Sequence, residues 1–164
     1  MSLQFSNQAL YETEIKDDVT LQLVSFTLGE EEFGINILQV QEINRLVNIT
    51  RVPNSPDFVE GVINLRGKII PIVDLRKRFG MPSADDTKNS RIVVVELSLS
   101  KVIGFLVDSV QEVLRISSSV VEPPPAMVGN IAADYITGVG KLEDRLLILL
   151  DLEKVLNEGE IAAL

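Results

Sequence analysis

Apolar and β-branched residues recur along the chain in short runs of strand length, separated by polar breaks that contain glycine or proline. This pattern predicts strands rather than long helices. The predicted strands are Val19–Leu28, Glu32–Ile37, Val40–Val52, Gly61–Leu65 and Lys68–Val73, then Arg91–Leu99, Val102–Val107, Val110–Ile116 and a hairpin that turns near Glu143–Asp144. Five short strands in about 70 residues predict a small barrel, and two such sets predict two barrels.

An internal duplication relates the two halves. Segment 58–79 aligns without a gap on 135–156, and six of the 22 positions are identical. The identical pairs are Gly61/Gly138, Val62/Val139, Leu65/Leu142, Asp74/Asp151, Leu75/Leu152 and Lys77/Lys154. Upstream, 33–43 aligns on 103–113 at an offset of 70 instead of 77. The second copy therefore carries a seven-residue insertion, which we assign to the proline-rich loop 122–134.

The duplication sets the expected domain organisation. We predict a first barrel copy at about 19–80, a polar linker at about 81–89 and a second copy at about 90–158. Exchange of strands between the copies is left open. Residues 1–18 are expected to form an N-terminal tail, and 159–164 a C-terminal tail.

Two of the hairpin strands are apolar on both alternating faces, namely Ile69–Val73 in the first copy and Leu146–Leu150 in the second. An outer strand face of a free-standing small barrel is usually polar, so both strands need a second cover. We expect each barrel to cover the other, which gives one compact body with a shared core; an external partner is the alternative. Pro71 cannot donate a ladder hydrogen bond, which favours an edge position for its strand.

A short helix is expected after each hairpin, including one near the C-terminus, because Asp74 and Asp151 follow the last strand residues. An aspartate at an N-cap accepts a hydrogen bond from a backbone N–H of the first turn. Two equivalent carboxylates could also form an aspartic-protease dyad. Each aspartate is followed by Leu rather than by Thr-Gly or Ser-Gly. We therefore interpret both as structural N-caps, with a hydrolase as the alternative.

Composition removes most kinds of active site. The 164 residues include no His and no Cys, which excludes Cys/His zinc sites, thiolate nucleophiles, disulfides and Ser-His-Asp relays. No GxxxxGK[ST] or GxGxxG motif is present to hold a phosphate, and the acidic clusters lack calcium-loop spacing. We therefore expect no enzyme activity, no metal and no cofactor.

Charge and hydropathy narrow the choice of partners. The net charge of −9 repels phosphate backbones, and Trp is absent, so nucleic-acid binding is disfavoured although a pair of oligonucleotide-binding barrels is a further alternative. No apolar run approaches the roughly 18 residues of a membrane span. The first 18 residues also lack the basic and apolar regions of a signal peptide. We expect a cytoplasmic protein without direct membrane insertion.

Two charged positions stand out as candidates for contact with a partner. Glu42 recurs as Glu112 in matching V-Q-E segments, whereas Arg66 at the hairpin tip is replaced by Glu143 in the second copy. Divergence at one exposed position within a retained framework is expected when two copies take on different binding roles, and a solvated charge is the simpler alternative. Gly61, like its counterpart Gly138, is expected at a bulge or a close backbone approach.

The sequence resembles the CheW family of chemotaxis coupling proteins over about residues 19–158. The resemblance is carried by FTLGEEEFGINILQVQEI (26–43), TRVPNSPDFVEGVINLRGKIIPIVDLRKRFG (50–80) and YITGVGKLEDRLLILLDLEKVL (135–156). The most specific block is N-L-R-G-K-x-I-P-I-V-D-L, which precedes a second, more divergent copy.

The resemblance implies a mostly all-β fold of two packed, five-stranded SH3-like barrels with short helices, and no catalysis. It implies an adaptor that bridges the histidine kinase CheA, whose regulatory domain shares the fold, to the cytoplasmic tips of methyl-accepting chemoreceptors in membrane-associated arrays. The implied partner-binding positions are Val40, Glu42, Gly61 and Arg66. A generic barrel interaction module of another two-component system is the alternative.

Overall fold

The computed structural model describes residues 18–124, 127–128 and 131–164. The predicted N-terminal tail lies almost entirely outside the described residues. The strands are β1 (Thr20–Leu28), β2 (Glu31–Asn36), β3 (Val40–Arg45), β4 (Val59–Leu65), β5 (Lys68–Asp74), β6 (Arg91–Leu97), β7 (Lys101–Val107), β8 (Ser109–Ser117), β9 (Val121–Glu122), β10 (Met127–Val128), β11 (Ile131–Ala132), β12 (Ile136–Lys141) and β13 (Leu146–Leu150).

Helices are few and short. The α-helices are α1 (Leu75–Arg78) and α2 (Glu158–Ala162), and the 3₁₀ turns are η1 (Ile37–Gln39), η2 (Ser98–Ser100), η3 (Ser118–Val120), η4 (Ala133–Tyr135) and η5 (Leu152–Lys154). The mostly-β prediction is confirmed. Residues 159–164, expected as a tail, instead form most of α2, and Ile161 of this helix is buried.

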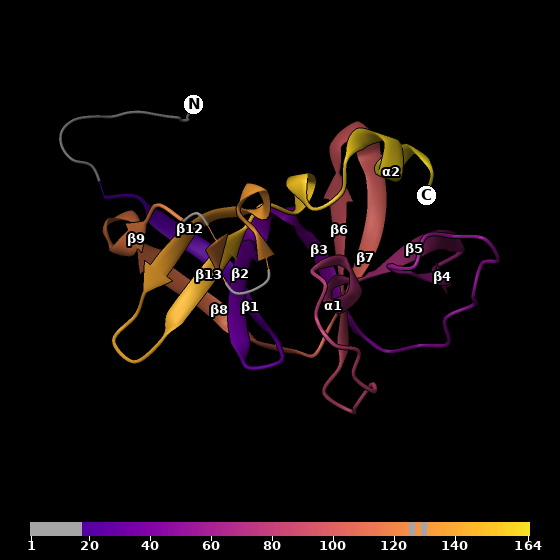
Figure 1. The fold of residues 1–164 in the computed structure, drawn as a ribbon, viewed down its shortest axis with the longest axis horizontal. Helices are drawn as coiled ribbons and strands as arrows, with labels where there is room; N and C mark the ends of the chain where they lie inside the picture. Colours follow the sequence, from indigo (N-terminus) through magenta and orange to yellow (C-terminus); the bar gives the residue numbers. More distant parts are fainter. Residues whose placement is uncertain (1–17, 125–126, 129–130) are drawn as a thin grey trace.

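Two SH3-like barrels are built from two sheets, and each sheet draws strands from both sequence copies. Barrel 1 has the strand order β8-β1-β2-β13-β12-β9, and barrel 2 has the order β3-β6-β7-β5-β4. Strands β1 and β2 of the first copy thus complete barrel 1, whose other strands come from the second copy. Strands β6 and β7 of the second copy complete barrel 2, whose other strands come from the first copy. Parallel pairing of β2 with β13 and of β5 with β7 joins the exchanged strands to their hosts. Figure 1 shows the two barrels side by side, with α1 at the edge of barrel 2 nearest barrel 1 and α2 above barrel 2.

A shared core holds the barrels together. Its largest buried cluster combines apolar residues of β1 and β2 with others of β6, β7, α1 and the C-terminal segment; Phe26, Phe33 and Phe105 are among its fully buried side chains. Smaller separate clusters fill barrel 2 around Ile72 and barrel 1 around Leu147. The expected compact body with a shared core is confirmed.

The prediction that β5 and β13 are covered on both faces holds only beyond their first positions. Ile70, Ile72 and Val73 are buried, as are Leu147 to Leu150, but Ile69 is 65% exposed and Leu146 is 59% exposed. These two residues are equivalent in the duplication and lie near the hairpin turns, and neither belongs to the shared core cluster.

Two details of the predicted strands are wrong. Strand β3 ends at Arg45 rather than at Val52, because the chain bends away and only Thr50 pairs with the sheet, through a bridge to Val62. Strand β5 is not at an edge despite Pro71, since it lies between β7 and β4. Its pairing with β7 begins at Ile72, so this ladder needs no N–H from Pro71.

Candidate functional site

The tip of the β4–β5 hairpin presents Arg66 to solvent. Arg66 and Gly67 have positive φ angles of 54° and 83°, as in the two-residue type I′ turns that suit antiparallel hairpins. The Asn64 Oδ1 atom accepts a hydrogen bond of 2.9 Å from the Gly67 N–H and fixes the turn. Arginine has no special preference for left-handed backbone, so the local fold alone does not account for an arginine at this position.

Glu42 of β3 and Arg66 form a two-point ion pair. The Arg66 Nη1 and Nη2 atoms donate to Glu42 Oε1 and Oε2, the second at 3.0 Å. The Arg66 side chain is 72% exposed and that of Glu42 is 24% exposed, so the acid is partly sheltered while the guanidinium faces solvent. The hydrogen bond from Arg66 lowers the pKa of the Glu42 carboxyl, and the same contact raises the pKa of Arg66.

Val40 and Gly61 lie on the same two strands but are less accessible. Val40 is half-buried against the shared core, at a bulge where β3 shifts register against β6. Gly61 is buried at a bulge between β4 and β5 with a φ of +150°. A Cβ atom there would lie 2.2 Å from the Thr50 carbonyl oxygen. The predicted close approach is therefore confirmed, and it brings the 49–50 segment against β4.

The second copy contains a related contact that sequence alignment concealed. Arg145 at the start of the β13 arm lies 2.8 Å from Glu32 (Nε to Oε1) and 3.3 Å from Glu112 (Nη2 to Oε2). Glu112 is the counterpart of Glu42, but Arg145 aligns with Lys68 rather than with Arg66. The arginine has thus moved two positions along the hairpin, and no one-residue motif could have revealed it.

Asp74 and Asp151 are N-caps, as predicted. The Asp74 Oδ1 atom accepts from the backbone N–H groups of Arg76 and Lys77 at the start of α1. Asp151 Oδ1 accepts from the Glu153 N–H at the start of η5, which is a 3₁₀ turn rather than an α-helix. Burial raises the pKa of Asp74, partly offset by these backbone donors. Both carboxylates are engaged by their own helices, which is the geometry of caps.

Sequence reasoning missed the ionic contacts made by α1. Arg78 donates to the Val155 carbonyl at 2.7 Å and to both carboxylate oxygens of Glu160, at 2.9 and 3.0 Å. Its guanidinium also lies over the rings of Phe58 and Tyr135. The hydrogen bonds to Val155 and Glu160 join segments more than 70 residues apart in sequence, so only the tertiary fold brings them together.

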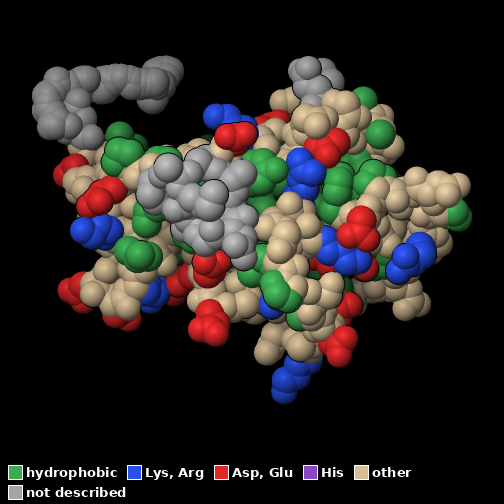
Figure 2. Space-filling model, in the orientation of Figure 1, with side chains coloured by type: hydrophobic (Ala, Val, Ile, Leu, Met, Phe, Trp, Pro, Cys, Tyr) green, Lys and Arg blue, Asp and Glu red, His purple; other side chains and the backbone are tan. Residues whose placement is uncertain are grey.

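The described part of the surface contains clefts. A cleft of about 910 Å³ opens beside Arg145 and Leu146, with Glu30, Glu31 and Glu122 along its rim. Figure 2 shows acidic and basic side chains interspersed over the visible face rather than gathered into one field of a single sign. Within residues 18–124, 127–128 and 131–164, no group of three or more acidic residues is placed to hold a metal ion. No helix in that same part of the chain is long and apolar enough to cross a bilayer.

Comparison with known proteins gives a consistent match over most of the chain. The family model described as CheW-like domain matches residues 22–160. The chemotaxis protein CheW of Klebsiella aerogenes is 42% identical over 146 residues, which cover 89% of this chain and 87% of that protein. The chemotaxis protein CheW of Thermotoga maritima is 36% identical, with coverage of 84% and 88%. The crystal structure of the scaffolding protein TtCheW from Thermoanaerobacter tengcongensis superposes with a TM-score of 0.77 at 42% identity, covering 84% of this chain and 92% of that one.

Proposed function

The chain belongs to the CheW-like family of chemotaxis scaffolding proteins, and from this premise we propose that it is a non-catalytic adaptor that couples CheA to chemoreceptors. In this proposal it binds the regulatory domain of the histidine kinase CheA and the cytoplasmic tip of a methyl-accepting chemoreceptor. It works in the cytoplasm, recruited to membrane-associated receptor arrays. Val40, Glu42, Gly61 and Arg66 form or support the partner-binding surface.

The observation that carries the proposal is an exposed, ion-paired arginine on a rigid double barrel. Arg66 is held by two hydrogen bonds to Glu42 in a turn whose left-handed backbone would suit Asn or Gly better. A restrained guanidinium loses less conformational entropy on binding than a freely moving one, so it is well suited to an interface. Ile69 lies exposed three residues away and adds apolar surface beside the charge.

Two supporting positions have distinct roles in this surface. Gly61 admits the backbone of Thr50, with hydrogen bonds of 2.9 and 2.8 Å between Thr50 and Val62. Val40 fixes the start of β3 against the shared core, two residues before Glu42. The contact surface is therefore held by backbone packing beneath it, and an adaptor needs such rigidity because its work is to keep two partners in a fixed relation.

The proposal is tested with Arg66→Glu in a reconstituted assay of receptor-dependent CheA autophosphorylation. The substitution places two like charges together at an exposed position, so we expect a stability change within about 0.5 kcal/mol. Loss of the interfacial cation should reduce kinase activation on the order of tenfold. Pull-down of kinase and receptor fragments would show which contact is weakened.

Lys68→Glu is the matched control, since Lys68 is exposed in the same hairpin and the substitution changes the net charge equally. We expect it to retain most of the activation. Full activation by the Arg66→Glu protein at matched concentration would remove Arg66 from the interface. Failure of the unmodified chain to activate any cognate kinase would contradict the proposed function itself.

A further inference from the structure

The two barrels are joined by an apolar core, and apolar contacts by themselves do not fix an angle. The hydrophobic effect is non-directional, so two packed surfaces can slide or rotate by small amounts while little apolar area returns to water. A directed polar contact across the same boundary removes that freedom. The structure contains such a contact at the point where the chain passes from β7 into β8.

Asp108 is the single residue between these strands, and it contacts both barrels. Its backbone N–H donates to the Thr27 carbonyl of β1 at 3.0 Å. One carboxylate oxygen, Oδ2, accepts from the Gly29 N–H in the β1–β2 turn at 2.7 Å. Thr27 and Gly29 belong to barrel 1, so these two hydrogen bonds fix Asp108 to that barrel.

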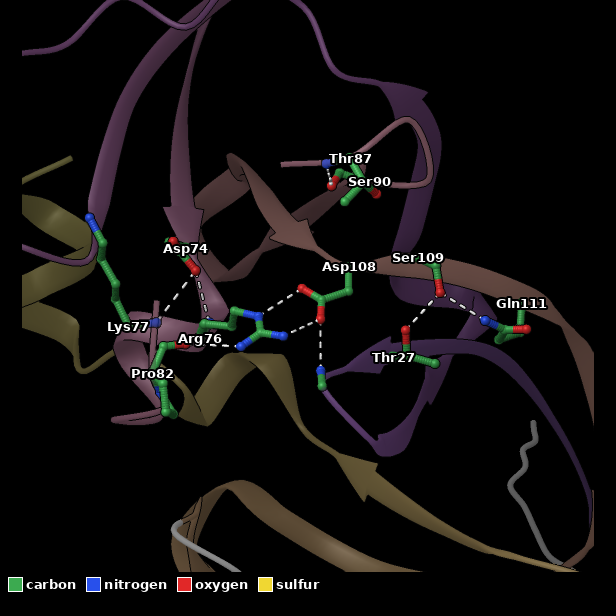
Figure 3. A network of polar contacts seen from close by, with 11 residues as sticks. Thr27, Asp74, Arg76, Lys77, Pro82, Thr87, Ser90, Asp108, Ser109 and Gln111 are labelled. Atoms are coloured by element: carbon green, nitrogen blue, oxygen red, sulfur yellow. Dashed lines mark hydrogen bonds and ion pairs between the residues drawn. The ribbon is translucent and has the colours of Figure 1, made fainter. Parts of the chain in front are cut away.

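Arg76 binds the same carboxylate from the side of barrel 2. It lies in α1, directly after β5, and its Nε and Nη2 atoms donate to Asp108 Oδ1 and Oδ2 at 2.8 and 2.5 Å. Its remaining nitrogen, Nη1, donates to the Pro82 carbonyl at 2.9 Å. Figure 3 shows the guanidinium between Asp108 and Pro82, with the Asp108 carboxylate turned toward Arg76. The planar guanidinium is thus fixed at three positions, which leaves it one orientation.

The ion pair between Arg76 and Asp108 is partly buried, and its two charges are opposite. The Arg76 side chain is 16% exposed and that of Asp108 is 32% exposed, so solvent screens the pair less than it screens a fully exposed one. Burial raises the pKa of Asp108, but the donors from Arg76 and Gly29 outweigh it, and the pKa lies below its usual value. The carboxylate is therefore charged at neutral pH.

A weaker contact of the same kind crosses the boundary through the second copy. Glu153 in η5 follows β13 of barrel 1, as Arg76 follows β5 of barrel 2, and the two align in the duplication. Glu153 Oε1 accepts from the Ser98 N–H at 3.0 Å and from its hydroxyl at 2.8 Å, in the β6–β7 turn of barrel 2. Asp108 thus holds the β1–β2 turn of barrel 1, and Glu153 holds the β6–β7 turn of barrel 2. Of these two carboxylates, Asp108 is the one that an arginine, Arg76, also binds.

We infer that Arg76 and Asp108 are positioning residues that fix the angle between the two barrels. They need not touch a partner. Their effect on coupling, which rests on the proposed function, arises because any partner that contacts both barrels at once meets two surfaces in a fixed relation.

The test measures the angle directly, and the absence of cysteine in the chain makes it practicable. Ile69→Cys in barrel 2 and Arg115→Cys in barrel 1, both at exposed strand positions, carry spin labels on the full chain. Distance distributions are then recorded by double electron–electron resonance. With Arg76→Gln we expect the distribution to shift or broaden by about 1–2 Å, the scale of small rearrangements between packed elements. Arg76→Lys, which keeps the charge but loses the two-nitrogen contact, should fall between Arg76→Gln and the parent.

Lys77→Gln is the control, because it removes the neighbouring ion pair with Glu60, which stays within barrel 2. It should leave the distribution unchanged. If Arg76→Gln does not fold, the same distances are measured in Asp108→Asn. This variant removes the charge that pairs with Arg76, while the amide oxygen can still accept the hydrogen bond from Gly29. A distribution identical to the parent in whichever of these variants folds would overturn the inference.

A parallel activation assay separates this inference from the proposed function. A several-fold loss of kinase activation in Arg76→Gln, together with a broadened distribution, supports both. Unchanged activation with a broadened distribution would overturn the claim that partners depend on the angle, while Arg66→Glu continues to report on the adaptor function.

Discussion

Each barrel contains an ion pair between a strand glutamate and an arginine of a hairpin, but the arginine occupies a different position in each barrel. In barrel 2, Glu42 pairs with Arg66 at the hairpin tip; in barrel 1, its counterpart Glu112 pairs with Arg145, which also reaches Glu32. Arg66 is largely exposed and has one carboxylate partner, whereas Arg145 contacts two acids from β8 and β2. The comparison teaches that a duplicated fold can keep an acid–arginine contact while the position of the arginine changes, so that one arginine is exposed at a turn and the other joins two strands.

The largest expected difference between the copies concerns the bulge glycines. Gly61→Ala should destabilise the chain on the order of 3–5 kcal/mol, because backbone strain is added to a collision with a carbonyl oxygen that cannot move freely. Gly138→Ala meets the Val121 Cγ1 atom at 2.7 Å and has no positive φ, so about 1–3 kcal/mol is expected. Urea unfolding of both variants measures the difference. Equal losses in the free energy of unfolding would contradict the expectation that the bulge at Gly61 tolerates a side chain less well than the bulge at Gly138.

A smaller effect should separate the two arginines. Arg145→Gln removes contacts to two carboxylates from different strands, and we expect a loss of about 1 kcal/mol in the free energy of unfolding. Arg66→Gln breaks one exposed pair and should change it by less than about 0.5 kcal/mol. Thermal unfolding in low and high salt provides the measurement, since salt screens ion pairs and should reduce the difference in stability between the two variants. A larger loss for Arg66→Gln would reverse the assignment of structural and partner-facing roles.

The smallest expected effect is a titration. Because Arg66 lowers the pKa of Glu42 in the folded chain, the pair stabilises the fold above the usual carboxyl pKa and loses this contribution as pH falls through the lowered value. Carbon-detected NMR of the Glu42 carboxyl should report that lowered pKa, and Arg66→Gln should return it toward the usual range. An unchanged Glu42 titration in the variant would show that the ion pair is not populated in solution.

Local patterns predicted the longer strands, both hairpin turns, the caps Asp74 and Asp151 and the bulge at Gly61, but not the two-residue strands β9, β10 and β11 in and beside the predicted loop 122–134. Each depends on residues close together in the chain, where propensity and turn chemistry act. The exposure of Ile69 and Leu146, the end of β3 at Arg45 and the interior position of Pro71 were predicted wrongly or not at all. These features depend on which distant element covers a strand. The alternation of apolar and polar residues indicates that a strand face is apolar, but it does not indicate which element packs against that face.

The candidate site divides in the same way. Glu42 and Arg66 could be singled out from sequence, and the structure brings them together. Their assignment to a partner surface stays a prediction. The contacts of Arg76, Arg78 and Arg145 could not be derived, since each joins segments tens of residues apart and single arginines carry no local signature.

The reciprocal strand exchange has a consequence for how the chain is made. Neither half of the sequence holds a complete barrel, so a fragment of either half would be left with open sheet edges. Phe33 of β2 pairs with Ile148 of β13, which means that barrel 1 cannot close until β13 has left the ribosome. Barrel 2, whose last strand is β7, can close earlier than barrel 1. Until β13 is available, β2 has an unpaired edge, and such an edge is exposed to pairing with other chains.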